Sequence, residues 1–180
     1  ILTLPERPPV PPDALPPRTA ALADRLWPIQ TWALAELEEA PAPRGLFCPV
    51  GVGHGKTYPS ILAGHVVGAS KPLLLVPAYL VSKARADVAA VAERFPEASV
   101  LPTVESVSRL SHPKHARLLF KAAPDVIVVD EAHVLSSMDA VCTRRLIEYA
   151  RARPDTRFVF LSGTFLDRSI EQVRHMQELA

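Results

Sequence analysis

Short apolar runs alternate with longer amphipathic stretches over most of the chain. Five runs are predicted to be strands, at residues 46–50, 72–76, 99–101, 126–129 and 158–161. Two of the stretches between them carry apolar residues at helical spacing. These residues are Ala84, Val88, Val91 and Phe95 in the first stretch, and Met138, Val141, Cys142, Leu146 and Tyr149 in the second. Continuous apolar runs joined by helical crossovers predict an α/β fold, with a mostly parallel sheet and helices on both of its faces.

The first 40 residues follow a different pattern. Residues 1–20 hold seven of the 19 prolines, and we expect them to form an extended Pro-rich tail outside the core, because proline fixes φ and lacks a backbone donor. From residue 21 to residue 40 apolar residues return at helical spacing, and Pro28 is expected at the start of a helix. Residues 21–180 are predicted to be one domain that closes with a helix at 167–179, because a chain of 180 residues that is 48% hydrophobic supplies one ordinary core.

Composition adds a few exclusions. The 20 basic and 19 acidic residues nearly balance, so net charge neither indicates nor excludes a polyanionic partner. Cys48 and Cys142 are isolated, and we expect buried thiols without a disulfide or zinc. No apolar run reaches the roughly 20 residues that span a bilayer, and the start has no signal-peptide segment, so we expect a soluble, cytoplasmic protein.

A glycine-rich segment directly follows the first apolar run and precedes a helical stretch. It consists of Gly51, Val52, Gly53, His54, Gly55, Lys56 and Thr57. Glycines let the backbone curl so that successive N–H groups face a phosphate, which makes all seven residues candidates for binding ATP. Lys56 is expected to reach the β- and γ-phosphates, and Thr57 to hold Mg²⁺ through its hydroxyl. The strict phosphate-loop pattern has glycine where this chain has Val50, and a glycine-rich turn that happens to end in Lys-Thr is the alternative.

The fourth apolar run leads straight into Asp130-Glu131-Ala132-His133. A buried parallel strand that ends in two carboxylates places them at the edge of the sheet where ligands of open α/β sheets bind. Asp130 is expected to hold Mg²⁺, and Glu131 to orient and deprotonate the water that attacks the γ-phosphate. Lys56, Asp130 and Glu131 are therefore the candidate catalytic residues. By itself an Asp-Glu pair at a strand end is usually a solvated turn.

The fifth run is followed by Ser162-Gly163-Thr164. The hydroxyls of Ser162 and Thr164 are expected to hydrogen-bond His133 or the acidic pair, and so to couple the γ-phosphate to the rest of the domain. The alternative is an ordinary turn with Ser and Thr caps.

The glycine-rich loop, Asp-Glu-Ala-His and Ser-Gly-Thr resemble motifs I, II and III of superfamily 2 helicases and translocases, in the usual order. The resemblance covers about residues 26–165 and implies a RecA-like ATPase domain that uses ATP and Mg²⁺. The segment Leu26-Trp27-Pro28-Ile29-Gln30 resembles the one that precedes the phosphate loop in many members. By that resemblance Gln30 recognises adenine, whereas an exposed helical glutamine is the alternative.

Residues 75–81 and 104–109 resemble motifs Ia and Ib of Swi/Snf-type translocases and related phage helicases. In that family these segments grip the sugar-phosphate backbone, so the resemblance implies nucleic-acid contacts, to DNA rather than RNA. The candidates are Pro77, Ser82, Lys83, Ser106 and Ser108. At each position a strand end followed by a capped helix is the alternative.

The resemblance also implies a second RecA-like lobe with motifs IV to VI and an arginine finger. Nothing after Thr164 resembles these motifs, so we expect that lobe elsewhere in a longer protein or in another chain. The sequence therefore predicts the ATP-binding lobe of a helicase or double-stranded DNA translocase, and a nucleotide-gated binding module without net unwinding is the second hypothesis. A P-loop kinase or GTPase fits less well, because no lid, acceptor pocket or Asn-Lys-x-Asp motif is visible.

Overall fold

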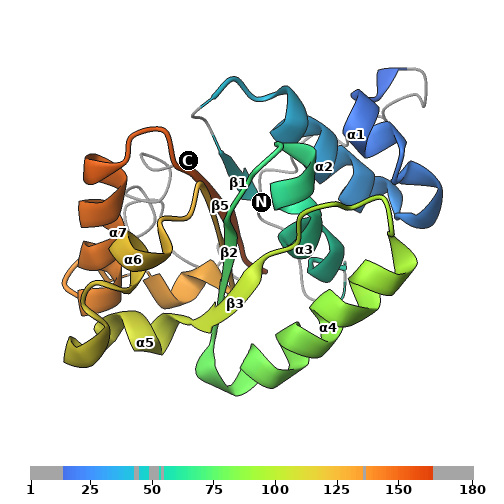
Figure 1. Ribbon diagram of the computed structural model, residues 1–180. Helices are drawn as coiled ribbons and strands as arrows, with labels where there is room; N and C mark the ends of the chain where they lie inside the picture. Colours follow the sequence, from blue (N-terminus) through green and yellow to red (C-terminus); the bar gives the residue numbers. More distant parts are fainter. Residues whose placement is uncertain (1–13, 43–44, 49–52, 54, 136, 164–180) are drawn as a thin grey trace, which may run out of the picture.

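The computed structural model describes residues 14–42, 45–48, 53, 55–135 and 137–163. Within these ranges the fold is α/β, with one sheet of five parallel strands in the order β1-β5-β4-β2-β3 (Figure 1). The strands are β1 (Leu46–Cys48), β2 (Pro72–Val76), β3 (Thr103–Ser106), β4 (Val126–Asp130) and β5 (Arg157–Leu161). The predicted α/β fold with a parallel sheet is confirmed.

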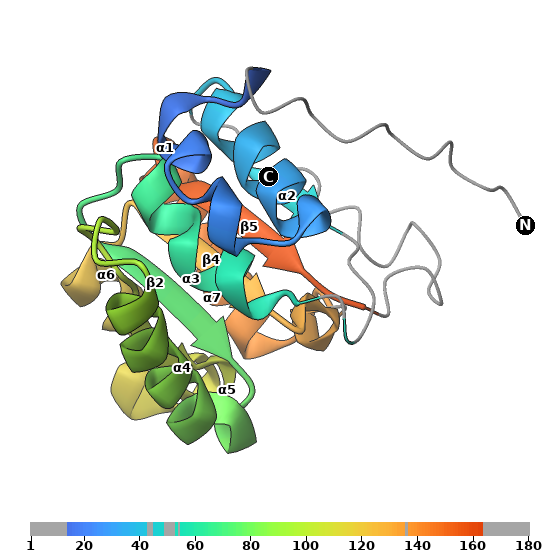
Figure 2. The same ribbon diagram turned by 90° about the vertical axis from the view of Figure 1, so that its right-hand side faces the viewer.

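Helices cover both faces of the sheet. One layer contains α1 (Pro17–Ala20), α2 (Pro28–Glu39), α3 (Thr57–Val66) and α4 (Val81–Arg94), with the short 3₁₀ helices η2 (Ala23–Arg25) and η3 (Ala78–Leu80). Figure 2 faces this layer and shows α2, α3 and α4 side by side. The other layer contains α5 (Val107–Ser111), α6 (Leu118–Ala122) and α7 (Val141–Ala152), with η4 (Pro113–His115) and η5 (Ala132–Leu135).

The central strands are apolar over most of their length because each of their faces packs against helices. Along β4, Val126 and Val128 belong to the core under α2, α3 and α4, whereas Ile127 and Val129 belong to the core under α5 and α7. Successive side chains of a strand point to opposite faces, so a strand covered on both sides carries no polar alternation. The same rule holds for β2, whose five residues are all buried.

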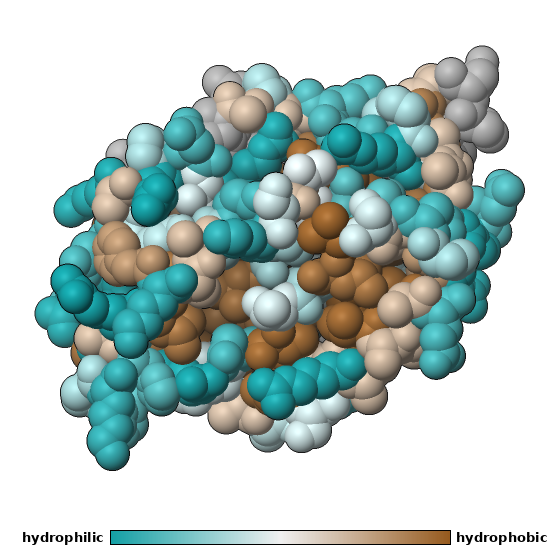
Figure 3. Space-filling model, viewed as in Figure 1, coloured by the Kyte–Doolittle hydropathy of each residue, from teal (hydrophilic) through white to brown (hydrophobic). Residues whose placement is uncertain are grey.

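The third strand lies at Thr103–Ser106, and the prediction at 99–101 was wrong. This strand is at the edge of the sheet and pairs only with β2. Its residues alternate between exposed or half-buried and buried, because one face of an edge strand needs less apolar cover. Figure 3 shows apolar residues between the two helical layers on the side where β3 lies, with hydrophilic residues over the helices around them.

The two predicted amphipathic helices differ in how many of their predicted apolar residues are buried. In α4, Ala84 and Val91 are buried, as is Phe95 at its end, and Val88 packs against them, as predicted. In α7 three predicted core residues are buried, namely Cys142, Leu146 and Tyr149, but Met138 is 50% exposed and Val141 is 36% exposed. The helix begins only at Val141, after an extended Ala140, so Met138 does not share the helical face that enters the core.

Packing begins before residue 21, where we expected the Pro-rich tail to end. Residues Pro17–Ala20 form α1, and Thr19 is completely buried. The amide and the hydroxyl of Thr19 donate to Oε2 of Glu38 at 2.7 and 2.8 Å. Pro28 starts α2 as predicted, and the helix expected at 167–179 lies outside the described residues.

Candidate functional site

The carboxyl ends of three strands lie level with one another. In the register of the sheet, Cys48 of β1 is opposite Leu161 of β5, and Leu161 is opposite Asp130 of β4. The glycine-rich segment follows β1, the two acids end β4 and Ser162 follows β5. The register therefore brings the three predicted motifs to one edge of the sheet, which is where open α/β sheets bind ligands.

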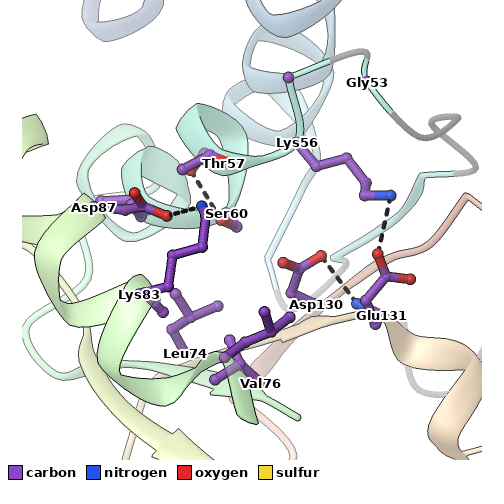
Figure 4. Close-up of a pocket in the computed structure, with 14 residues that line it drawn as sticks. Gly53, Lys56, Thr57, Ser60, Leu74, Val76, Lys83, Asp87, Asp130 and Glu131 are labelled. Atoms are coloured by element: carbon purple, nitrogen blue, oxygen red, sulfur yellow. Dashed lines mark hydrogen bonds and ion pairs between the residues drawn. The ribbon is translucent and has the colours of Figure 1, made fainter.

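A cavity of about 510 Å³ opens at this edge (Figure 4). Its lining includes Lys56 and Thr57 at the start of α3, and Asp130 and Glu131 at the end of β4. Nζ of Lys56 lies 3.4 Å from Oε1 of Glu131, and the Lys56 side chain is only 10% exposed. The structure thus places the candidate phosphate-binding cation and the candidate general base on opposite walls of one cavity, and they form an ion pair across it.

The backbone turns sharply where β4 ends. Glu131 has a φ of 52°, in the left-handed region that non-glycine residues seldom adopt. Its N–H donates to Oδ1 of Asp130 at 2.9 Å. Such a conformation costs about 1–3 kcal/mol and is found most often at functional sites. Here it directs the Glu131 carboxylate toward Lys56 rather than along the strand.

Asp130 is a partly buried carboxylate beside two lysines. Burial raises the pKa of Asp130, the neighbouring Glu131 charge raises it further, and Lys56 and Lys83 lower it. The hydrogen bond from the Glu131 N–H also lowers this pKa. Because burial disfavours the charged form, a cation bound at this carboxylate would be stabilising.

Among the described residues, no three His, Cys, Asp or Glu side chains are grouped to hold a metal. Thr57 and Asp130 both line the cavity and offer a hydroxyl and a carboxylate oxygen. Mg²⁺ is commonly held by one or two protein oxygens, with waters and substrate phosphates as its other ligands. The donors in the cavity therefore fit Mg²⁺ that arrives with a phosphorylated substrate.

His133 connects the acidic pair to the neighbouring strand. Its Nδ1 lies 3.2 Å from Oε2 of Glu131 and 3.3 Å from Oγ of Ser162. Ser162 is completely buried, and its N–H donates to the carbonyl of Cys48 at 3.4 Å. The contact that the sequence predicted between His133 and the serine is present, while Thr164 lies outside the described residues.

Gln30 is buried at 3% exposure and is not the exposed glutamine of the alternative interpretation. Its Oε1 accepts from the N–H of Trp27 at 2.8 Å, and its Nε2 donates to the carbonyl of Gly55 at 2.9 Å. An amide has two N–H donors and an oxygen with two lone pairs, so the described residues leave one donor and one acceptor position of Gln30 unused. Gln30 ties the start of α2 to the loop before α3.

A second cavity, of about 420 Å³, adjoins the first. Aromatic and basic side chains line it, including Trp27, Tyr58, Arg25 and Arg94. The guanidinium of Arg94 lies 5.5 Å from the centre of the Tyr58 ring, and Trp27 is 58% exposed. Flat aromatic and guanidinium groups provide stacking surfaces for a planar ligand.

The other candidates are distributed as follows. Lys83, predicted to contact nucleic acid, lines the first cavity and forms an ion pair of 2.6 Å with Asp87, one helical turn along α4. Ser106 caps α5 by accepting from the N–H of Arg109 at 3.3 Å, and Ser108 lies 3.0 Å away from it. Pro77 and Ser82 flank η3 at the end of β2. Gly51, Val52 and His54 lie outside the described residues.

Sequence reasoning missed a third, basic cavity of about 340 Å³ beside the end of β3. Its charged and titratable lining residues are Glu105, Arg109, Lys114, His115, Arg117 and Lys121. The pKa of His115 is lowered first by desolvation and then by the charges of Arg109, His112 and Lys114, while Glu105 raises it. The density of basic residues between 109 and 121 was the available signal.

Comparisons with known proteins add no relative: no protein-family model matches the chain, and no curated protein matches its sequence. Within the described residues, no helix is both long and apolar enough to cross a membrane. Both expected thiols are buried, at Cys48 and Cys142, and both are free.

Proposed function

We propose that this chain is the ATP-binding lobe of a nucleic-acid-dependent ATPase, a RecA-like first domain of a helicase or double-stranded DNA translocase. The observation that carries the proposal is the first cavity, which gathers Lys56, Thr57, Asp130 and Glu131 from two separate motifs. A cation, a hydroxyl and two carboxylates at the end of a parallel sheet are the groups that Mg²⁺-dependent phosphoryl transfer requires.

The ion pair between Lys56 and Glu131 defines how the site would respond to substrate. The phosphates of ATP would compete with Glu131 for Lys56, because they carry more charge than one carboxylate. Mg²⁺, bound through Thr57 and Asp130, would supply charge neutralisation at the phosphates. Glu131, released from Lys56, would then accept the proton of the attacking water. His133 would stay beside Glu131 and connect that event to Ser162 on the neighbouring strand.

The second cavity is proposed to hold the base. It is continuous with the first through Gly55 and Thr57, so a nucleotide whose phosphates lie at Lys56 can extend into it. The free donor and acceptor positions of Gln30 suit the adenine edge, and the exposed ring of Trp27 supplies a stacking surface.

Nucleic acid is proposed to bind along the ends of β2 and β3. Tyr79 follows β2 and is 81% exposed, which is the exposure expected of a side chain that stacks on a sugar or base. The basic cavity beside β3 would attract backbone phosphates. Lys83 is better assigned to the nucleotide cavity than to this surface, since it already lines that cavity.

The deciding experiment is ATP hydrolysis by the protein together with its second lobe, measured with and without double-stranded DNA, single-stranded DNA and RNA. Stimulation by one polymer is expected, with loss of activity in Lys56→Ala and in Glu131→Gln. Lys71→Ala is the matched control, because Lys71 is exposed next to the start of β2, at the opposite edge of the sheet.

The controls separate binding from chemistry. Glu131→Gln should still bind ATP, whereas Lys56→Ala should bind it more weakly. Hydrolysis without stimulation by any polymer would contradict the translocase proposal and favour the nucleotide-gated binding module. An unaffected Glu131→Gln variant would contradict the assignment of the base.

A further inference from the structure

The two cavities on either side of the start of α3 share three residues, Gly55, Thr57 and Asp87. Gly55 and Thr57 belong to the loop and helix start that separate the cavities. Asp87 belongs to α4 and is the single acidic residue among the shared three. Figure 4 shows its side chain joined to the ammonium group of Lys83.

The boundary between the cavities corresponds to a definite part of a nucleotide. Under the proposed function, the phosphates lie in the first cavity at Lys56 and the base lies in the second at Gln30 and Trp27. The ribose joins the phosphates to the base, so it must lie at the shared residues. Asp87 is therefore placed next to the ribose, and this step depends on the proposed function.

A carboxylate close to a polyphosphate is unfavourable unless it faces a hydrogen-bond donor or a cation. Oδ2 of Asp87 already accepts from Nζ of Lys83 at 2.6 Å. Oδ1 of Asp87 has no hydrogen-bond partner among the described residues. An ionised carboxylate only accepts hydrogen bonds, and the donors that a nucleoside triphosphate carries between its base and its phosphates are the 2′ and 3′ hydroxyls of ribose.

We propose that Asp87 binds the ribose of the nucleotide by accepting hydrogen bonds from its hydroxyls, and that it makes the site prefer a nucleotide with both ribose hydroxyls over an analogue that lacks the contacted one. Lys83 acts as a positioning residue, because its ion pair fixes one oxygen of Asp87 and leaves the other without a partner among the described residues. This arrangement gives a role to the third acid of the cavity, which also contains Asp130 and Glu131.

The test is equilibrium binding by calorimetry in the presence of Mg²⁺, with ATP, 2′-deoxy-ATP and 3′-deoxy-ATP as ligands. Wild-type protein is expected to prefer ATP over at least one deoxy analogue by about tenfold or more, because hydrogen bonds to a charged group contribute at that level. Asp87→Ala should bind ATP and that analogue equally.

Two controls keep the result specific. Glu93→Ala removes an exposed acid from the same helix without touching either cavity, and it should preserve the preference. Asp87→Ala also frees Lys83, which alters phosphate affinity, but this change affects ATP and its deoxy analogues alike. The ratio of their dissociation constants therefore isolates the contact with the sugar.

The outcomes are distinguishable. If wild-type protein binds ATP and both analogues equally, or if Asp87→Ala keeps the preference, the ribose contact is overturned and the proposed function stands. If wild-type protein binds none of the three, the proposed function fails together with it. Thermal unfolding of each variant without nucleotide verifies that the fold is intact.

Discussion

Gly53 and Gly55 offer a matched pair of substitutions in the glycine-rich loop. Both have a left-handed backbone, with φ of 83° and 74°. Among the described residues, a Cβ added at Gly53 meets nothing within 4 Å, whereas a Cβ added at Gly55 overlaps Nε2 of Gln30. Replacing either glycine by alanine incurs about 1–2 kcal/mol of backbone strain. Only Gly55→Ala also displaces the buried Gln30 amide.

The size of that second cost follows from the hydrogen bond at stake. Displacing Gln30 breaks its 2.9 Å bond to the Gly55 carbonyl and leaves a buried amide without its partner, which costs about 1–3 kcal/mol. Gly55→Ala should therefore be less stable than Gly53→Ala by about 1–3 kcal/mol. For a domain of this size, each kcal/mol lowers the melting temperature by about 2–4 °C.

Urea unfolding followed by circular dichroism measures the difference. The same two substitutions in a Gln30→Ala background complete the cycle, since the overlapping side chain is then gone. There the two glycine variants should agree within about 0.5 kcal/mol. Equal costs in the wild-type background, or a difference that survives Gln30→Ala, would refute the link between Gln30 and the loop.

Three further outcomes are expected. Burial raises the pKa of the Cys48 thiol to about 11 despite the nearby Lys56, so at pH 8 about one thiol in a thousand is ionised. Ellman's reagent should therefore label Cys48 slowly in native protein and rapidly in urea. Fast labelling of the native protein would contradict this burial. The double substitution Arg117→Ala and Lys121→Ala should weaken DNA binding. It should also reduce the slope of the logarithm of the DNA association constant against the logarithm of the salt concentration by about 0.9 per lost phosphate contact. An unchanged slope in a salt titration would exclude the basic cavity from the DNA interface. His133→Ala should lower polymer-stimulated hydrolysis more than basal hydrolysis, and steady-state rates that fall by the same factor would argue against coupling.

Four of the five predicted runs coincide with strands. The inner strands β2, β4 and β5 were predictable because a strand between two helical layers is apolar over most of its length. Of the two edge strands of the described sheet, β1 was predicted and β3 was not. The edge strand β3 contains one large apolar residue, Val104, and no run announces it. Leu101, at the end of the predicted run, packs against the core that contains Val104, but it precedes the strand and is not part of it. Whether a strand lies at the edge depends on the arrangement of the whole sheet, so the residues of β3 alone do not reveal it.

In the site, the positions of the motifs were predictable from the sequence, but the contacts of individual side chains were not. The loop and the acidic pair were recognisable because each follows an apolar run that predicts a parallel strand, and the carboxyl ends of parallel strands meet at one edge of the sheet. The position of Lys83 was not recognisable, because the segment around it resembles a nucleic-acid-binding motif. Its partner Asp87 lies four residues further on, and that spacing was the available signal for an ion pair on one face of α4. A motif identifies the strand end at which a residue lies, but the neighbouring helix decides which cavity its side chain enters.

Gln30 extends this argument to a residue whose identity was predicted and whose contacts were not. The resemblance assigned its amide to adenine, while the structure commits one oxygen lone pair and one N–H to Trp27 and Gly55. These two hydrogen bonds are compatible with a contact to adenine, since the amide has a second donor and a second acceptor position. An adenine bound there would contact a side chain that already holds the loop in place. Loss of Gln30 should therefore weaken ATP binding in part through the loop, and a base analogue that cannot use the amide should lose less affinity than the Gln30→Ala variant does.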